Sequence, residues 1–326
     1  MKKLNKERKG IWSCLMALLL LATTCFGMNS GDLKERSAYA EDFQFITQNG
    51  GWCWFSDPRA IYVNDRVIGG YVDDEGSIFA FAYEPTSQQT QRVKVYDKLQ
   101  YDDHANPSVM EMEDGRIAIF FSKHGGHGLP LFYKISKNPG DITSWGDLQK
   151  IYPKTEGFFG PTYSNPIHLS DENGRVYVFF RGTDYKPNFV YSDDNLKTWT
   201  KAYTLVKNDS LHGKGRPYAK YATNNKDKIF VAFTDEHPRG SATNSIYFIL
   251  YKNGKFYKAD GTEVGDKIEN GITHSQADLV YDAKKTFDKA WIWDVAFDEE
   301  ERPVLVYARF SDATNRHSYW YARWNG

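Results

Sequence analysis

Two histidines, His104 and His124, have the residue type and spacing to act as a general acid–base pair. His104 lies in YDDHANPSV (101–109), behind two carboxylates, and His124 lies in FFSKHGGHG (120–128). The intervening SVMEMEDGRIAIFFS is typical of a β-hairpin, and a two-residue turn at Asp114-Gly115 would place Glu113 opposite Arg116. Extending that register outward predicts that the two histidines lie at the same open end of the hairpin, one on each side. Imidazole readily takes up and releases protons near neutral pH.

A structural role is the alternative for the same residues. A histidine near a strand end commonly makes a structural hydrogen bond, and carboxylates before a strand, such as Asp102 and Asp103, are typical of turn caps. The pairing of the two histidines by register is the observation that favours a reaction centre.

Further basic and phenolic residues occur where other predicted hairpins begin or end. They are Tyr163 in GPTYSNP, Arg181 in VFFRGT, Arg216, Tyr218, Lys220 and Tyr221 in GRPYAKY, and His237 and Arg239 in FTDEHPRG. The strands around them are apolar, and residues at such ends often carry function. Tyr218 and Tyr221 could equally pack between neighbouring strands.

Histidine, tyrosine and arginine together suit proton abstraction beside a carboxylate. In a uronic acid, the ring proton next to the carboxylate is a poor acid until the negative charge is neutralised, and the planar guanidinium of arginine can bind both oxygens. A neutral histidine or an ionised tyrosine can then take the proton, and a histidine or tyrosine can protonate the departing glycosidic oxygen. The reaction is a β-elimination, which leaves an unsaturated uronate and consumes no water.

The elements that must position these groups are predicted to be β-strands throughout. Short runs rich in Val, Ile, Phe and Tyr alternate with Gly, Asn and Asp turns, and no long stretch has helical periodicity. Hairpins recur as AIYVNDRVIGGYV, SVMEMEDGRIAIFFS, NPIHLSDENGRVYVFFRG, KYATNNKDKIFVAFTD and WIWDVAFDEEERPVLVYARF. A repeated antiparallel unit of this size predicts an all-β fold, a β-propeller of four-stranded blades.

An Asp-box pattern supports blades. SDDNLKTW (192–199) has the Ser-x-Asp-x-Gly-x-Thr-Trp form, with Leu196 in place of the glycine, and SKNPGDITSW (136–145) is a looser version. In this turn, Ser and Asp cap backbone groups and Trp packs between strands. The pattern indicates architecture rather than activity.

Composition and the N-terminus bound the class of protein. The formal net charge of −1 gives no reason to expect nucleic acid as a partner. Residues 1–40 are predicted to be a signal peptide: lysines and an arginine precede a short apolar run, and Ala38-Tyr39-Ala40 resembles a cleavage site, so no membrane span is expected. Lipid attachment at Cys25 is a weaker alternative. The mature, secreted domain is then 41–326, with Cys53 as its single cysteine.

The chain resembles BNR-repeat β-propeller polysaccharide lyases, the family that includes ulvan lyases. The resemblance covers about Gly50 to the last residue, through GGWCWFSDPRAIY, DDHANPSV, KHG, TYSNP, FFRG, RPYAKY, FTDEHPR and YARWNG. It implies a seven-bladed propeller, an acidic polysaccharide as the binding partner, and no cofactor for the chemistry. It also implies site residues: His104, His124, Tyr163, Arg181 and Tyr221 as catalytic groups, and Arg216, Lys123, Tyr218 and Asn106 as substrate-binding groups. Arg216 is an alternative to Arg181 as the carboxylate neutraliser.

Several alternatives stay open at this point. Family members continue beyond YARWNG, so about five blades are expected here and the chain is expected to be incomplete at its C-terminus. A rhamnosidase-like glycoside hydrolase would need a carboxylic acid pair, for which Asp102, Asp103, Asp235 and Glu236 are candidates. A non-catalytic sugar-binding propeller could use Trp52, Trp54 and Tyr221 as stacking platforms. His237, His274 and His317 lack short ligand spacing; a structural metal ion is possible, and the oligomeric state is open.

Overall fold

The computed structural model describes residues 45–126, 128–153, 160–208, 215–240, 242–311 and 313–326. The predicted signal peptide, residues 1–40, and the alternative lipid site at Cys25 lie outside these residues. The fold and the site described below lie in the compact unit Asn49–Gly326. Among the described residues, there is no helix with the length and apolar character needed to cross a membrane.

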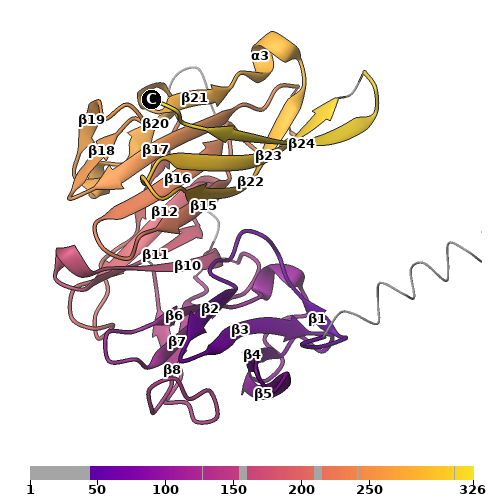
Figure 1. Cartoon of the computed structure of the whole chain (residues 1–326), viewed down its shortest axis with the longest axis vertical. Coiled ribbons are helices and arrows are strands. Elements are labelled where there is room, and N and C mark those ends of the chain that lie inside the picture. The colour runs from indigo at the N-terminus through magenta and orange to yellow at the C-terminus, as the bar shows by residue number, and fades with distance from the viewer. Residues whose placement is uncertain (1–44, 127, 154–159, 209–214, 241, 312) are drawn as a thin grey trace, which may run out of the picture. The chain divides into compact units, whose positions relative to one another are not determined.

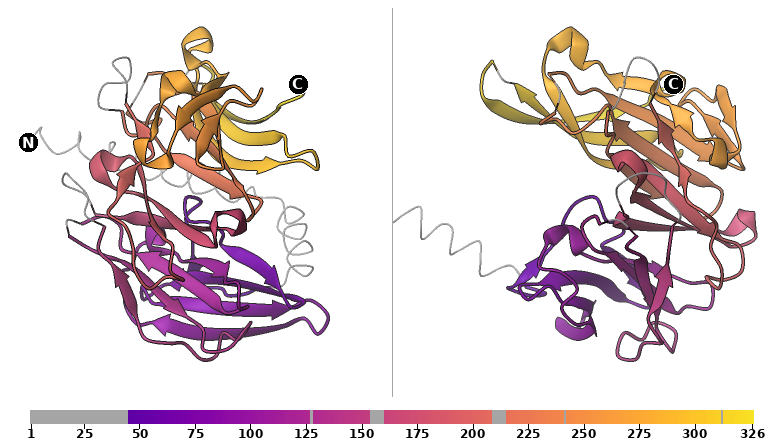
Figure 2. Two further views of the ribbon diagram at one scale, coloured as in Figure 1. Left: turned by 90° about the vertical axis from the view of Figure 1, so that its left-hand side faces the viewer. Right: turned by 180° about the vertical axis from the view of Figure 1, so that it is seen from behind.

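Five antiparallel sheets, the blades, follow one another in chain order (Figures 1 and 2). Blade 1 consists of β1 (Gly50–Gly51), β2 (Ala60–Val63), β3 (Arg66–Asp73), β4 (Ile78–Glu84) and β5 (Gln89–Tyr96). Blade 2 consists of β6 (Ser108–Glu111), β7 (Ile117–Ser122), β8 (Leu131–Ile135) and β9 (Gln149–Ile151). Blade 3 consists of β10 (Thr162–Leu169), β11 (Arg175–Arg181), β12 (Pro187–Ser192) and β13 (Tyr203–Thr204).

Blades 2 and 3 have four strands each, whereas blade 1 has five and the last two blades depart from four as well. Blade 4 has six strands: β15 (Ala219–Thr223), β16 (Lys228–Thr234), β17 (Ile246–Lys252), β18 (Lys255–Tyr257), β19 (Glu263–Asp266) and β21 (Asp278–Tyr281). Blade 5 has three: β22 (Lys289–Phe297), β23 (Pro303–Ser311) and β24 (Arg316–Arg323). A short parallel pair joins β14 (Val206–Lys207) to β20 (Ile272–Thr273). The helices are short: η1 (Asp103–Ala105), η2 (Ser170–Glu172), η3 (Thr183–Tyr185), η4 (Ile268–Asn270), η5 (His274–Gln276) and α3 (Ala283–Thr286).

In the middle strands of blades 2 and 3, apolar side chains alternate between the two faces, and both faces are covered. In β7, Ile119 packs toward blade 1 and its neighbour Phe120 packs toward blade 3. In β11, Val178 packs toward blade 2 and Phe179 toward blade 4. Successive strand residues point to opposite faces of the sheet. A strand whose blade is covered on both faces by neighbouring blades must therefore be apolar at every position. This explains the uninterrupted runs IAIFF and VYVFF in the sequence.

One strand from each blade lines a common cavity. Residues of β2, β6, β10 and β15, with Asp294 of β22, surround a volume of about 960 Å³. Convergence of one strand from every sheet on a central space is the arrangement of a β-propeller. One end of these strands carries the histidine loops, so the blades bring residues distant in sequence to one site.

The register of the blade 2 hairpin corrects one sequence prediction. The structure pairs Glu111 with Ile117 and Ser108 with Phe120, and the Met112 N–H continues the ladder to the Arg116 carbonyl at 2.8 Å. The turn is therefore a three-residue loop and not the predicted two-residue turn. Gly115 adopts φ +77°, the left-handed conformation that closes such loops. When this pairing is continued outward past Ser108 and Phe120, His104 and His124 fall at directly facing positions.

The Asp box folds as expected from its side chains. Asp194 accepts hydrogen bonds from the N–H groups of Lys197 and Thr198, at 3.1 and 2.8 Å, and Ser192 accepts one from Leu196 at 3.0 Å. The Thr198 hydroxyl also donates to Asp194 at 2.6 Å, and this bond together with the backbone N–H bonds lowers the pKa of Asp194 to about 2. Leu196 has φ +66°, a left-handed backbone conformation. Glycine adopts this conformation most readily, which is why the Asp-box pattern normally has glycine at this position. The Leu196 side chain is buried, so packing holds the turn.

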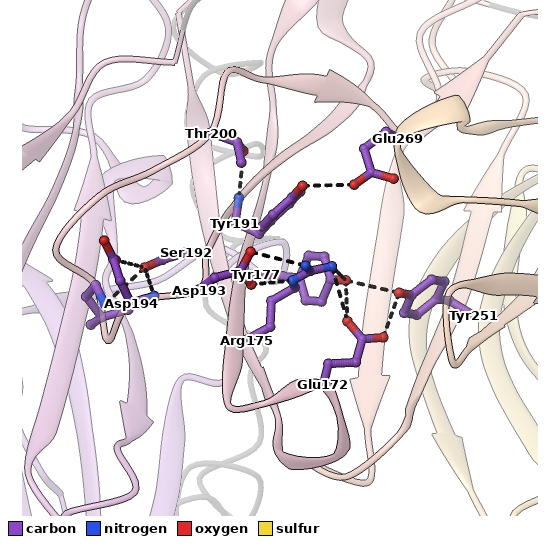
Figure 3. Close-up of polar contacts among 11 residues, drawn as sticks. Glu172, Arg175, Tyr177, Tyr191, Ser192, Asp193, Asp194, Thr200, Tyr251 and Glu269 are labelled. Atoms are coloured by element: carbon purple, nitrogen blue, oxygen red, sulfur yellow. Dashed lines mark hydrogen bonds and ion pairs between the residues drawn. The ribbon is translucent and has the colours of Figure 1, made fainter.

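A buried polar network ties blade 3 to blade 4 (Figure 3). The two oxygens of Glu172 accept hydrogen bonds from the hydroxyls of Tyr177 and Tyr251, each at 2.6 Å. Tyr177 lies on β11 and Tyr251 on β17, and both are almost completely buried. Arg175 binds both oxygens of Asp193 nearby, at 2.6 and 3.1 Å. Glu172 thus satisfies a hydroxyl from each blade.

Tyr251→Phe is expected to destabilise the protein by about 1–2 kcal/mol, because one carboxylate oxygen of Glu172 loses a hydrogen bond in a buried position. The measurement is urea unfolding followed by tryptophan fluorescence. Tyr152→Phe is the matched control, since Tyr152 is 62% exposed. Equal midpoints for the two variants would show that the network adds nothing to stability.

Candidate active site

His104 and His124 lie face to face at one end of blade 2. His104 is the central residue of η1, just before β6, and His124 follows the end of β7. The ring centroids are 3.9 Å apart with 7° between the planes. The side chains are 29% and 34% exposed, so a ligand can reach both rings. The prediction that the hairpin brings these two residues together is confirmed.

One carboxylate lies between the two imidazoles. Asp102 caps η1 by accepting a hydrogen bond from the backbone N–H of His104 at 2.9 Å. Its Oδ1 is 2.7 Å from Nδ1 of His104, and its Oδ2 is 2.8 Å from Nδ1 of His124. Partial burial raises the pKa of Asp102, but the bonds from His104 and His124 outweigh it and lower this pKa to about 2. Asp102 is therefore a carboxylate at any physiological pH.

Tyr163 lies beside His104 in a strained part of β10. The register of β10 against β11 shifts between Thr162 and Asn165, and Tyr163 adopts φ +64° within this irregularity. Left-handed backbone is uncommon for a bulky residue, and such strain often occurs at functional sites. The phenol ring is 5.5 Å from the His104 ring and 4% exposed. Burial raises the pKa of Tyr163 far above its usual value although Arg181 opposes this, so the hydroxyl keeps its proton.

Arg181, the last residue of β11, faces Tyr163 from the adjacent strand. Its guanidinium carbon is 4.9 Å from the Tyr163 ring centroid, and its Nη1 donates a hydrogen bond to the hydroxyl of Tyr218 at 2.8 Å. The structure therefore groups both histidines, Tyr163, Arg181 and Tyr218 from three blades. A guanidinium beside a tyrosine and paired imidazoles can bind a carboxylate next to groups that move protons.

Arg216 lies farther out and connects to Arg181 through Tyr185. Its guanidinium carbon is 3.8 Å from the Tyr185 ring centroid, and that of Arg181 is 5.6 Å from the same centroid. Because Arg181 also contacts Tyr163 and Arg216 does not, Arg181 is the better placed of the two candidate neutralisers. Arg216 remains exposed, as a substrate-binding group requires.

The remaining predicted residues occupy three different environments. Tyr221 lines a cleft together with Tyr163 and Arg181, but its ring is stacked on Phe179 at 4.5 Å. Lys123 is half-buried next to His124. Asn106 is 1% exposed, and its carbonyl oxygen accepts a hydrogen bond from the Cys53 N–H at 2.9 Å. In this structure Asn106 supports the loop of His104 and is not open to a ligand.

Lys220 is a structural residue of the same region. Its side chain is 1% exposed, and it donates hydrogen bonds to the Trp54 carbonyl and to Asp57. A buried ammonium needs such partners. Lys220 thus ties the segment before β2 to β15.

Three residues at the site have roles that the sequence did not predict. The sequence offers Asp102 as a turn cap or as a carboxylic acid of a hydrolase, and it contains no signal that Asp102 binds both histidines. Tyr185 is placed by consecutive left-handed residues, Asp184 and Tyr185, at φ 52° and 60°. The Trp291 ring centroid is 4.7 Å from that of His237 and 5.6 Å from that of Tyr218. The Trp291 contacts depend on the folding of separate blades, so local sequence patterns could not indicate them.

His237 packs against Tyr218, one of the residues that line this cleft, with 5.5 Å between the ring centroids. Its Nδ1 accepts a hydrogen bond from the Arg239 N–H at 3.0 Å, which places the neutral ring's proton on Nε2. Burial lowers the pKa of His237, and the positive charges of Arg239 and Arg181 lower it further. His237 can therefore donate a hydrogen bond to a ligand without carrying charge.

The histidine cluster is the one place in the described part of the chain where three potential metal-ligand side chains converge. One ligand atom from each of Asp102, His104 and His124 lies within 4.8 Å of the others. Both Nδ1 atoms already face the Asp102 carboxylate, so these hydrogen bonds satisfy the cluster without an ion. Of the other histidines, His274 is buried with Nε2 3.2 Å from the Thr234 carbonyl, and His317 packs against Phe310. A structural ion stays a prediction.

The fold and the turns define the class of the protein as an Asp-box β-propeller. The chain belongs to the BNR repeat-containing family, whose model matches residues 68–326. This confirms the resemblance drawn from the sequence motifs.

Two ulvan lyases are among its relatives. The chain is 32% identical to an ulvan lyase of Alteromonas sp. (strain LOR), over 87% of this chain and 65% of the relative. It is 28% identical to Ulvan Lyase-PL25 of Pseudoalteromonas sp. (strain PLSV), over 55% of this chain and 40% of the relative. The chain thus spans less than two thirds of the length of these relatives.

Solved structures support the fold. A polysaccharide lyase family PL25 ulvan lyase superposes with a TM-score of 0.68 at 18% identity, covering 87% of this chain and 72% of that one. The structure of a PL25 ulvan lyase bound to -[GlcA(1-4)Rha3S]- superposes with a TM-score of 0.69 at 17% identity, with the same coverage. At these identities the likeness establishes the β-propeller architecture.

Proposed function

We propose that this chain is the catalytic propeller of a polysaccharide lyase that cleaves a uronate-containing glycan by β-elimination. The observation that carries the proposal is the grouping of two stacked imidazoles with Tyr163 and Arg181. These four side chains supply the proton acceptor, the proton donor and the carboxylate neutraliser that elimination requires.

Each group has a distinct task in this mechanism. Arg181 binds the uronate carboxylate and stabilises the negative charge that develops on it as the adjacent ring C–H loses its proton. A neutral imidazole of the pair takes that proton at Nε2. The bond from the neighbouring ring carbon to the glycosidic oxygen breaks, a carbon–carbon double bond forms, and the departing oxygen receives a proton. Tyr163 is suited to donate that proton, because burial keeps its hydroxyl protonated and Arg181 stabilises the phenolate left behind.

A hydrolase mechanism fits the same residues less well. It would need a carboxylic acid that gives a proton to the leaving group. Asp102 has a pKa of about 2 and both of its oxygens are bound by histidines, so it cannot be that acid. Asp235 accepts a hydrogen bond from the Ser245 N–H at 2.8 Å, which ties it into the connection between β16 and β17.

The relatives and the site chemistry favour an ulvan-like substrate. Two curated relatives carry the name ulvan lyase, and a similar structure holds a glucuronate–sulfated rhamnose repeat. The arginines at the site suit an acidic polymer, and no step in this mechanism calls for a cofactor. The predicted signal peptide would export the enzyme to such an extracellular polymer. Recognition of a non-reacting glycan by stacking on Trp52, which is 51% exposed, is the remaining alternative.

Incubation with ulvan is expected to raise ultraviolet absorbance, because elimination alone creates a double bond conjugated with the carboxylate. The matched control is the same polymer with its carboxyl groups reduced to alcohols, which should give no signal. New reducing ends without absorbance would establish hydrolysis instead. Binding without either product would leave a sugar-binding propeller and contradict the proposed function.

A further inference from the structure

We propose that Asp102 is a positioning residue that fixes the orientation and tautomer of both imidazoles, with His124 dependent on it alone and His104 supported by a second carboxylate. The inference deepens the proposed function, because it explains how two histidines present reactive nitrogens to one substrate. It rests on the geometry of the Asp102, His104 and His124 side chains.

The hydrogen bonds determine the tautomers. A carboxylate is an acceptor only, so each Nδ1 that faces Asp102 must carry a proton. In a neutral ring the lone pair is then on Nε2, on the other side of the imidazole, where it can accept a proton from substrate. With distances of 2.7 and 2.8 Å to its two oxygens, Asp102 imposes this state on both rings and holds them in their stack.

The two histidines differ in how many carboxylates hold them. Nδ1 of His104 is also 2.8 Å from Oδ1 of Asp103, a side chain that is 54% exposed. Nδ1 of His124 faces Asp102, and its backbone N–H donates to the Gln100 side chain at 2.8 Å. Loss of the Asp102 carboxylate should therefore release the His124 ring and leave the His104 ring held by Asp103.

Capping of η1 is the purely structural role that must be separated from positioning. Asparagine is as good an N-cap as aspartate, so Asp102→Asn retains the cap. The bond from the His104 N–H then keeps the amide oxygen at the place of Oδ1. The amide NH₂ takes the place of Oδ2, and as a donor it can pair with Nδ1 of His124 only if that nitrogen is unprotonated. The variant thus reverses the His124 tautomer while η1 stays capped.

The experiment is a long-range ¹H–¹⁵N spectrum of the resting protein, with signals assigned from His104→Gln and His124→Gln. In the wild type, both rings are expected to carry the neutral-state proton on Nδ1. In Asp102→Asn, His124 is expected to move its proton to Nε2 and His104 to keep its own on Nδ1. The double variant Asp102→Asn/Asp103→Asn should disturb both rings. Asp114→Asn, at the far end of the same hairpin, is the matched control and should leave both unchanged.

Kinetics provide a second readout. Asp102→Asn is expected to lower kcat by about 10²- to 10⁴-fold, with KM within twofold, because the change from carboxylate to amide gives a catalytic histidine the wrong tautomer without changing the geometry. A proton on Nε2 of either histidine in the wild type would overturn the inference, as would an Asp102→Asn variant with unchanged tautomers and kcat. So would activity that a chelator abolishes and zinc restores, since the cluster would then hold a metal ion. The spectrum does not depend on turnover: if no uronate polymer is cleaved, the proposed function fails while the tautomers still test Asp102.

Discussion

Replacement of either histidine of the stacked pair is expected to lower kcat for the proposed elimination by about 10²- to 10⁴-fold, the range that general acid–base groups contribute. His104→Ala and His124→Ala each remove one imidazole of the stacked pair and leave Asp102 with one partner. The measurement is the initial rate of absorbance increase with ulvan. KM should change little, because Arg181 and the other cationic side chains that would bind the polymer remain.

The matched control is His168→Ala. His168 lies toward the opposite end of β10 and pairs with Glu113 at 3.1 Å, away from the stacked rings. If the two stacked imidazoles act as a unit in the proposed mechanism, the double variant His104→Ala/His124→Ala should lose little more activity than the worse single variant. A single variant that keeps wild-type kcat would remove that histidine from the mechanism. Additive losses would mean that the two rings act in separate steps.

The histidine pair was predictable because it depends on one hairpin. Apolar runs on each side of Glu113-Asp114-Gly115 determine which residues face each other, and a one-residue error in the turn left both histidines at the same end. The turn itself was misjudged, because Asp-Gly occurs both in two-residue turns and at the end of three-residue loops. A change of register inverts which side chains share a face, so the observed ladder, not the predicted one, explains why the rings stack.

Contacts between blades could not be predicted in the same way. The bulge at Tyr163 replaces regular pairing between Thr162 and Asn165, yet TYSNP contains no glycine to indicate it. Asn165 explains part of it in hindsight: its side chain accepts a hydrogen bond from the Asp57 N–H at 3.0 Å and donates one to the Phe55 carbonyl at 3.0 Å. Tertiary hydrogen bonds thus hold the bulge, and no local propensity describes them.

Asn106 shows that a site role inferred from a family resemblance does not always agree with the position of the side chain in the folded chain. A polar residue next to a catalytic histidine is a reasonable candidate for substrate binding from the sequence alone. In the folded chain its amide satisfies the buried N–H of Cys53, which would otherwise lose a hydrogen bond. Asp102 is the opposite case, a residue with an ordinary capping pattern that turns out to bridge both imidazoles.

Arg181→Gln is expected to lower kcat/KM on ulvan by about 10²- to 10³-fold, the usual effect of removing one charge-stabilising group from a transition state. The glutamine can still hydrogen-bond Tyr218 but carries no charge to neutralise the uronate. Arg181→Lys should lose less, because it keeps the charge but not the planar fork that binds both carboxylate oxygens. Arg92→Gln is the matched control, since Arg92 is an exposed arginine of β5. The measurement is the initial rate at low substrate concentration.

The methyl ester of the same polymer separates carboxylate neutralisation from a general effect on the cleft. An esterified uronate carries no negative charge, so its ring proton is already more acidic and Arg181 has less to stabilise. The ratio of wild-type to Arg181→Gln activity should therefore shrink towards one on the ester while remaining large on the free acid. Because Arg181 also contacts Tyr163 and Tyr218, a variant that merely disordered these tyrosines would lose the same factor on both substrates. Equal losses would assign Arg181 to positioning Tyr163 and leave Arg216, which reaches the site through Tyr185, as the candidate that binds the carboxylate.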